Sequence, residues 1–403
     1  MLNIEKKIIT WCKQHSVVFF VIFTTVLALL VRYVMLNFVS GDYESFLKEW
    51  INSLREQGGL SGLRTYTGDY NAPYVTILAL LSYIPINSLY TIKIISILFD
   101  FALAISCALL VKKIQKRPGN FLPTITYAVV LFLPNVVLNS AAWAQCDSIY
   151  TTFVVLSFYF LFNKKYRWSF IMLGVAFAFK FQFIFVLPVY IIIYLQQQKF
   201  SILNFLYIPA ANLLLCLPAL IAGRPIDQIL SVYFNQTQTY AGSLVLNFPN
   251  IYNVIPADRG SIGMFSIAGI IVAMMICICV AFFIIANKIV LSERQILKLA
   301  IWFCVILTFV LPCMHERYLF IGEILSVVYA LVYGKDWYLA FCINIIALLT
   351  YSAFLLGAKI DMPFLSIVYA MVIFYYSIQT FRDFSSIETG HLARLVTGKN
   401  RKH

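Results

Sequence analysis

The chain has 403 residues, of which 62% are hydrophobic and 12% charged, and its formal net charge is +13. A soluble core of this length could not bury so much apolar surface, so the composition excludes an ordinary globular protein and indicates a polytopic membrane protein. The long apolar runs predict an all-α helical bundle. No nucleic-acid partner is expected, because no basic face with interleaved aromatic residues lies on a soluble surface.

Apolar segments recur along the whole chain. The first of them is too long for the apolar core of a signal peptide and is expected to stay as an anchor. In chain order the segments cover 17–38, 88–111, 121–138, 148–162, 168–179, 182–195, 200–221, 263–286, 299–313, 319–333, 338–356 and 364–381. They predict about 12 transmembrane helices in a single domain over residues 1–381, followed by a basic tail over 382–403.

Lysines and arginines gather in the short connections between these segments and in the tail. The positive-inside rule puts such connections in the cytoplasm, together with both termini, and makes the number of helices even. The two large loops, 39–87 and 222–262, then lie on the extracytoplasmic side. We therefore expect a multi-pass protein of the plasma (inner) membrane, with its polar motifs facing outward.

The first large loop has helical features of its own. Its apolar residues at helical spacing predict an amphipathic helix on the membrane surface; they are Phe46, Leu47, Trp50, Ile51 and Leu54. The apolar run 74–84 ends before Pro85 and is too short for a span, so we interpret it as a re-entrant or interfacial helix.

Two aspartates near the outer ends of predicted helices could carry chemistry. Asp42, in Gly41-Asp42-Tyr43-Glu44, is a candidate general base, and its alternative role is to cap a helix. Asp147, in Trp143-Ala144-Gln145-Cys146-Asp147, opens the helix 148–162. It could bind a substrate hydroxyl or hold Gln145 in place, and its alternative role is that of an N-cap.

Two short polar motifs interrupt the apolar pattern farther along the chain. Lys180, with Gln182 close by, separates two short apolar segments and needs a negatively charged partner, either an anionic headgroup or a carboxylate of Asp147 or Glu316. In His315-Glu316-Arg317 the arginine offers several donors to a phosphate, and the histidine can donate to a leaving oxygen. A purely structural knot of these three side chains is the alternative. We expect both turns to line a cavity within the outer leaflet.

These motifs, in this order, resemble the GT-C superfamily of integral-membrane glycosyltransferases. The likeness is greatest to the endoplasmic-reticulum glucosyltransferases that use dolichyl-phosphate-glucose and to their bacterial relatives. The matching stretches are Gly41-Asp42-Tyr43-Glu44 with Trp50, Asp69-Tyr70-Asn71-Ala72-Pro73, Trp143-Ala144-Gln145-Cys146-Asp147, Phe179-Lys180-Phe181-Gln182 and Met314-His315-Glu316-Arg317. The second stretch departs from the family's Asp-Tyr-Pro-Pro element, since Asn71-Ala72 replaces the first proline.

The resemblance implies transfer of a hexose from a polyprenyl-phosphate carrier to an acceptor hydroxyl, with inversion, in the synthesis of a cell-surface glycan. Asp42 would be the general base. The substrate would be bound by Tyr43, Glu44, Asp69, Tyr70, Trp143, Gln145, Asp147, Lys180, Gln182, His315, Glu316 and Arg317. Lys180, His315 and Arg317 would meet the charge of the leaving phosphate.

No cofactor and no obligatory metal ion are expected, because the outer loops contain no Asp-any-Asp motif. The expected partners are membrane lipid, the lipid-linked donor, and a glycan, glycolipid or other hydroxyl acceptor. The rival interpretations are a lipid-linked glycan ligase or polymerase and a secondary transporter. A transporter commonly consists of two related halves, and the sequence shows no internal repeat.

Overall fold

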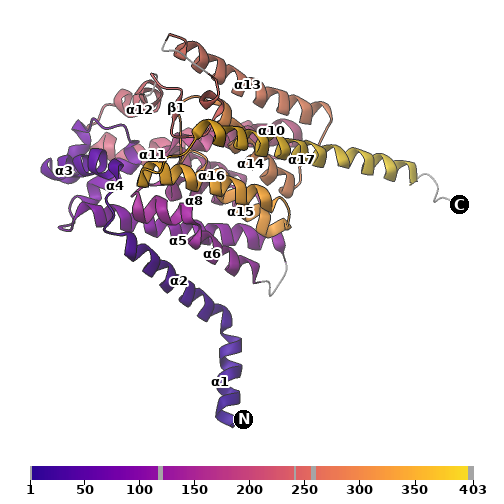
Figure 1. Ribbon diagram of the computed structural model, residues 1–403, viewed down its shortest axis with the longest axis horizontal. Coiled ribbons are helices and arrows are strands. Elements are labelled where there is room, and N and C mark those ends of the chain that lie inside the picture. The colour runs from indigo at the N-terminus through magenta and orange to yellow at the C-terminus, as the bar shows by residue number, and fades with distance from the viewer. Residues whose placement is uncertain (1, 117–120, 240–241, 256–259, 398–403) are drawn as a thin grey trace. The chain divides into compact units, whose positions relative to one another are not determined.

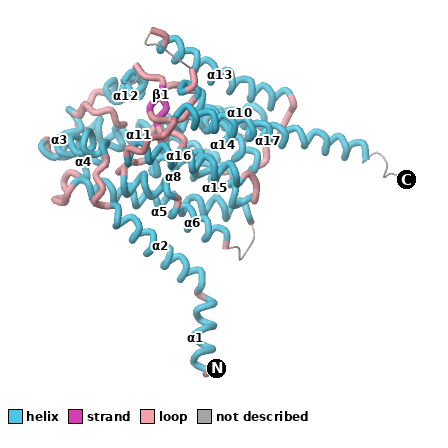
Figure 2. The backbone as a smooth tube through the Cα atoms, viewed as in Figure 1, coloured by secondary structure: helices cyan, strands magenta, loops and turns pink. Residues whose placement is uncertain are grey.

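The structure is a computed structural model of the chain and describes residues 2–116, 121–239, 242–255 and 260–397. Helices form nearly all of its regular structure (Figure 2), which confirms the predicted all-α class. Contacts group the chain into two compact units, one of Met1–Phe183 with Leu203–Gln236 and one of Ile184–Ile202 with Thr237–His403. The single domain expected over 1–381 stays a prediction.

Within the described residues, six helices are long and apolar enough to cross a membrane: Ser16–Met35, Ser88–Gln115, Ile202–Ile221, Ile262–Ala286, Trp337–Leu356 and Met362–Phe384. The pair Leu122–Phe132 and Pro134–Ala142, bent by 54°, makes a seventh if it is one span. The predicted number of 12 spans is therefore not confirmed. Several predicted segments form helices of 10–17 residues, which is less than the roughly twenty residues of a full crossing.

The first unit carries most of the predicted polar motifs. Its elements are α1 (Asn3–Gln14), α2 (Ser16–Met35), η1 (Tyr43–Leu47), α3 (Lys48–Glu56), η2 (Gly59–Thr65), α4 (Ala72–Leu81), α5 (Ser88–Gln115), α6 (Leu122–Phe132), α7 (Pro134–Val137), η3 (Leu138–Ala142), α8 (Asp147–Phe162), α9 (Tyr166–Phe179), η5 (Ile202–Leu206) and α11 (Tyr207–Ile221). Helix α5 packs against α6 and α8 (Figure 1). Helix α9 packs against α8 and α11. Two further elements, η4 (Phe181–Phe185) and α12 (Ile226–Thr239), cross the boundaries between the units, as does η5 at its first residue.

The helix predicted within the first large loop is present as η1 and α3. Leu47, Ile51 and Leu54 are buried on its inner face, while Phe46 is exposed. This face packs against η2 and α4, and α4 is the helix predicted for 74–84. Apolar spacing along the chain thus identified both helices of the loop.

Lys93 fixes the start of this loop. Its ammonium group lies in the unit interior and donates to the carbonyls of Met35, Leu36 and Phe38 at 3.0, 3.0 and 2.6 Å. The last carbonyls of a helix lack partners within the helix and carry partial negative charge, so a lysine is a favourable cap there. Lys93 therefore holds the end of α2, from which the chain continues to Asp42.

A buried ion pair connects α2 to α5. Arg32 Nε lies 2.9 Å from Asp100 Oδ2, and both side chains are almost fully buried. Ser140 and Ser148 donate to the two oxygens of Asp100 at 2.5 and 2.6 Å, and Arg32 also donates to the carbonyl of Leu131 at 3.1 Å. Such pairs persist in a low-dielectric interior when the remaining polar atoms are also hydrogen-bonded.

The second unit has the elements α10 (Leu187–Gln197), β1 (Val245–Leu246), η6 (Ile251–Asn253), α13 (Ile262–Ala286), α14 (Glu293–Val310), β2 (Met314–His315), α15 (Phe320–Tyr333), α16 (Trp337–Leu356) and α17 (Met362–Thr397). Helix α14 is central to its contacts, since it packs against α10, α13, α15 and α17. The two short strands pair in parallel, with Val245 opposite Met314 and Leu246 opposite His315.

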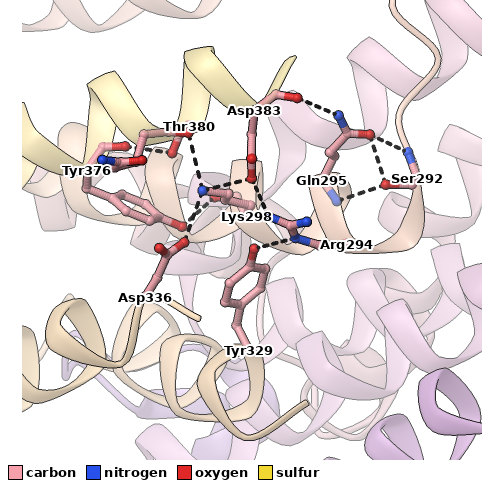
Figure 3. A network of polar contacts seen from close by, with 10 residues as sticks. Ser292, Arg294, Gln295, Lys298, Tyr329, Asp336, Tyr376, Thr380 and Asp383 are labelled. Atoms are coloured by element: carbon pink, nitrogen blue, oxygen red, sulfur yellow. Dashed lines mark hydrogen bonds and ion pairs between the residues drawn. The ribbon is translucent and has the colours of Figure 1, made fainter. Parts of the chain in front are cut away.

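A polar network ties one end of α14 to α17 (Figure 3). Lys298 is buried and lies 3.0 Å from carboxylate oxygens of both Asp336 and Asp383. Arg294 lies 2.5 Å from Asp383 and donates to the hydroxyl of Tyr329 at 3.0 Å. The predicted topology puts this network at the cytoplasmic end of the second unit, where it holds α17 at Asp383.

Candidate functional site

The carboxylate of Asp42 is held by two side chains that lie about a hundred residues away in the sequence. The indole Nε1 of Trp143 donates to Asp42 Oδ2 at 2.9 Å, and Gln145 Nε2 donates to the same oxygen at 2.6 Å. The hydroxyl of Tyr70 in turn donates to Gln145 Oε1 at 2.9 Å. Three of the predicted motifs therefore meet in the first unit, and together they orient one carboxylate.

Ser40 caps the helical stretch that leads into η1: its hydroxyl accepts a hydrogen bond from the Tyr43 backbone N–H at 3.2 Å. The same hydroxyl donates to the carbonyl of Trp143 at 2.8 Å, which ties the two loops together. The Asp42 side chain makes no capping hydrogen bond. The contacts therefore assign the capping role to Ser40 and not to Asp42.

The backbone on both sides of this contact is irregular. The π-helical turn η1 directly follows Asp42, and the second π-helical turn, η3, directly precedes Trp143. Ala144, between Trp143 and Gln145, has a left-handed φ of 66°. Such turns are uncommon and recur at functional sites, because they redirect side chains that a regular helix would point elsewhere.

An aromatic wall continues from the Asp42 contact along the first loop. The ring of Tyr70 lies 5.3 Å from that of Trp50 and 4.8 Å from that of Tyr74, and Trp50 lies 5.9 Å from Phe46 and 6.0 Å from Tyr66. Trp50 and Tyr70 are half-buried, so part of each ring is accessible. Flat faces with a polar edge suit a ligand that presents both C–H groups and hydroxyls.

Lys180 is paired with Asp147. Its Nζ lies 2.5 Å from Asp147 Oδ1, and Asn139 Nδ2 donates to the other carboxylate oxygen at 2.8 Å. Of the two carboxylates considered as partners of Lys180, Asp147 and Glu316, the structure pairs it with Asp147. Nearby, Gln182 is 9% exposed, and its Oε1 accepts no hydrogen bond from the described residues.

Asn139 is a site residue that was not identified from the sequence. Its side chain holds Asp147, and its backbone carbonyl accepts a hydrogen bond from the Gln145 backbone N–H at 2.9 Å, so Asn139 connects the Lys180 pair to the Asp42 contact. An asparagine within an apolar segment is a weak signal by itself. Its role depends on the π-helical turn η3, in which it lies.

The His315 turn belongs to the second unit and falls between α14 and α15, as predicted. Glu316 is fully buried and accepts a hydrogen bond from Arg317 Nη1 at 3.1 Å, while His315 Nδ1 lies 4.0 Å from its other oxygen. The imidazole packs edge-on against Tyr318 at 5.1 Å. These contacts are those of the structural knot. The His315 and Arg317 side chains keep 15% and 13% of their surface exposed, so each can still meet a ligand.

Tyr43 and Glu44 line an open groove of about 650 Å³ between the start of the first loop and the α4–α5 connection. The Tyr43 hydroxyl lies 2.7 Å from that of Ser88, and Glu44 pairs with Lys48 at 2.5 Å. The hydrogen bond to Glu44 raises the pKa of Lys48. The remaining predicted residue, Asp69, is exposed in the first loop.

Arg224 is a second residue that sequence analysis missed. It follows α11, is 5% exposed, and places its guanidinium 5.2 Å from the centre of the Tyr66 ring. Its Nε and Nη1 make no hydrogen bond in the described part of the chain. A single arginine in a loop gives no sequence signal, because most such residues are exposed.

Among the described residues, no group of three or more His, Cys, Asp or Glu side chains is placed to hold a metal ion. No protein-family model and no curated protein matches the chain. The fold defines a helical protein whose apolar helices suit a membrane.

Proposed function

We propose that the protein is a membrane glycosyltransferase that transfers a hexose from a polyprenyl-phosphate carrier to an acceptor hydroxyl on the extracytoplasmic side of the plasma (inner) membrane, with both termini in the cytoplasm. The observation that carries the proposal is the Asp42 carboxylate, oriented by Trp143 and Gln145. Positioned carboxylates serve as general bases. The aromatic wall beside it offers surfaces for a sugar ring.

The proposed reaction is a single displacement. Asp42 takes the proton of the acceptor hydroxyl while the acceptor oxygen forms a bond to the anomeric carbon. The bond between that carbon and the phosphate oxygen breaks, and the phosphate leaves with the bonding electrons. One carboxylate is sufficient because phosphate is a good leaving group, whereas a glycosidase needs a second carboxyl group as an acid.

The leaving phosphate gains negative charge, which a cation must stabilise. In the first unit, Lys180 is a candidate for this role, and it would exchange part of its contact with Asp147 for the phosphate. His315 and Arg317 remain proposed phosphate ligands on the strength of the resemblance. In this proposal the chain's own cations meet the phosphate charge, and no metal ion is required.

The test is transfer by the purified protein in liposomes, with labelled polyprenyl-phospho-hexoses and glycolipid acceptors. Asp42→Asn should bind the donor normally but lower turnover at least about a hundredfold, the usual scale for loss of a general base. Glu49→Gln, which neutralises an exposed acid on α3, is the matched control and should keep full turnover. Near-normal turnover in Asp42→Asn would refute Asp42 as the base. Movement of the labelled lipid without hexose transfer would favour a transporter.

A further inference from the structure

Arg224 is a buried cation with hydrogen-bonding capacity that the described structure does not use. Its backbone is fixed by a hydrogen bond to the carbonyl of Ala219 at 3.0 Å, next to Gly223, whose φ of +92° suits glycine. Its guanidinium lies over the ring of Tyr66, and neither Nε nor Nη1 has an acceptor in the described part of the chain. Burying a charged group without a partner is costly. An arginine in this state is therefore a candidate binding residue, for which a bound ligand would supply the missing hydrogen-bond acceptors.

Tyr66 lies beside this guanidinium. The hydroxyl proton of Tyr66 is buried and has no acceptor within the described residues. Burial raises the pKa of Tyr66, so the hydroxyl keeps its proton at neutral pH. Burial also lowers the pKa of Arg224, but an arginine stays protonated in a protein. Among the described residues no carboxylate is in hydrogen-bonding contact with this pair, although the charge of Asp69 acts on Tyr66 and also raises its pKa. A cation and a neutral hydroxyl donor side by side are suited to an anion.

This pair lies on the same wall as Asp42. Tyr66 packs edge-on against Trp50 at 6.0 Å, and Trp50 packs against Tyr70 at 5.3 Å. The hydroxyl of Tyr70 then reaches Gln145, which donates to Asp42. Every contact in this series lies within the first unit. A ligand along the wall would therefore have the carboxylate of Asp42 at one end and Arg224 at the other.

We propose that Arg224 and the hydroxyl of Tyr66 form a binding site for a phosphate group. The planar guanidinium presents two N–H groups that match two phosphate oxygens, and Tyr66 can donate to a third. The phosphate could belong to the lipid carrier or to a phosphorylated acceptor. The site is separate from Lys180, whose charge Asp147 already balances. Its role in substrate binding rests on the proposed function, whereas the binding of phosphate does not.

The test measures phosphate binding without any transfer reaction. The full chain in nanodiscs of zwitterionic lipid is titrated with inorganic phosphate and, separately, with a polyprenyl monophosphate, the unphosphorylated polyprenol being the reference. Binding is followed by tryptophan fluorescence, for which Trp50 is a nearby reporter, and by the rise in melting temperature. Wild type should bind at least one phosphate probe, and Arg224→Met should weaken that binding about tenfold or more.

Two further variants sharpen the test. Arg224→Lys should retain part of the affinity, because the charge survives while the planar fork is lost. Arg167→Gln is the matched control, since it removes an exposed arginine at the start of α9 and should bind phosphate as wild type does. Without ligand, Arg224→Met should melt at or above the wild-type temperature, because it removes a buried and unpaired charge.

The outcomes separate the possible sources of the phosphate. Arg224-dependent binding of the lipid probe alone identifies the carrier phosphate, whereas binding of inorganic phosphate as well identifies a site that accepts a soluble or acceptor phosphate. The proposal fails if wild type binds neither probe, or if Arg224→Met binds both as well as wild type does. If binding depends on Arg224 but the protein transfers no hexose, the proposed function is refuted and the phosphate site is supported. If the protein transfers hexose but phosphate binding does not depend on Arg224, the proposed function is supported and the phosphate site is refuted.

Discussion

Lys180 and Asp147 form a buried ion pair in which Nζ and Oδ1 lie 2.5 Å apart, although 33 residues separate them in the sequence. The pair links the end of α9 to the start of α8, and Asn139 holds its second carboxylate oxygen. It gives Lys180 a structural role in addition to the one proposed in phosphate binding. The two roles predict different behaviour of the single and double variants.

Removal of one member of this pair should destabilise the first unit. Lys180→Met or Asp147→Asn alone removes one half of this ion pair and leaves the opposite charge buried, at a cost of about 3–5 kcal/mol. The double variant removes both charges and should recover most of the wild-type melting temperature in detergent. If Lys180 also binds the leaving phosphate, the double variant will be stable but slow in transfer. A double variant with wild-type turnover would leave Lys180 with its structural role alone.

Arg317 is tested in the same way against its contact with Glu316. If it binds the carrier phosphate, Arg317→Ala should weaken binding of free polyprenyl phosphate as well as slow transfer, and Arg317→Lys should retain part of both. As part of the structural knot, its loss would leave buried Glu316 without its 3.1 Å partner and destabilise the second unit. Affinity and melting temperature are measured on the same purified variant. A variant that melts early but binds the carrier normally would remove Arg317 from the site.

The pair Arg32–Asp100 should be required for stability alone. Arg32→Met leaves the Asp100 carboxylate with only its serine donors among the contacts described above, so we expect a loss of about 3–5 kcal/mol and a lower melting temperature. Ser106→Ala, on the same helix as Asp100, removes a hydroxyl that donates to the carbonyl of Ala102 at 2.7 Å, a hydrogen bond within one turn of the helix, and should cost little. Equal melting temperatures for the two variants would contradict this assignment.

The predicted topology can be tested with a membrane-impermeant thiol reagent on intact cells. Thr67→Cys, in the exposed part of the first loop, should be labelled from outside. Asn287→Cys, exposed beside Lys288 in the connection between α13 and α14, should be labelled only after the membrane is permeabilised. The native Cys12, exposed on α1, should likewise be protected. Labelling of Asn287→Cys from outside would overturn the orientation and, with it, the extracytoplasmic site.

Local patterns in the sequence determined the helical class and the positions of its elements. Apolar runs predicted the helices on either side of Lys180 and His315, and helical spacing predicted the amphipathic helix that begins near Phe46. These features depend on neighbours within a few residues, because helix formation and apolar periodicity are local. The number of membrane crossings could not be determined in this way, since a short apolar segment reads the same whether it spans, re-enters or packs inside the protein.

The partners of the polar groups were decided by the tertiary structure alone. Asp42 receives its hydrogen bonds from Trp143 and Gln145 across about a hundred residues, and Lys180 is paired with one of the two carboxylates that the sequence left open. Arg224 looked like any loop arginine until packing buried it against Tyr66. A charge in a sequence has no defined environment. Burial and distance set its interactions, and both depend on how segments far apart in the chain pack together.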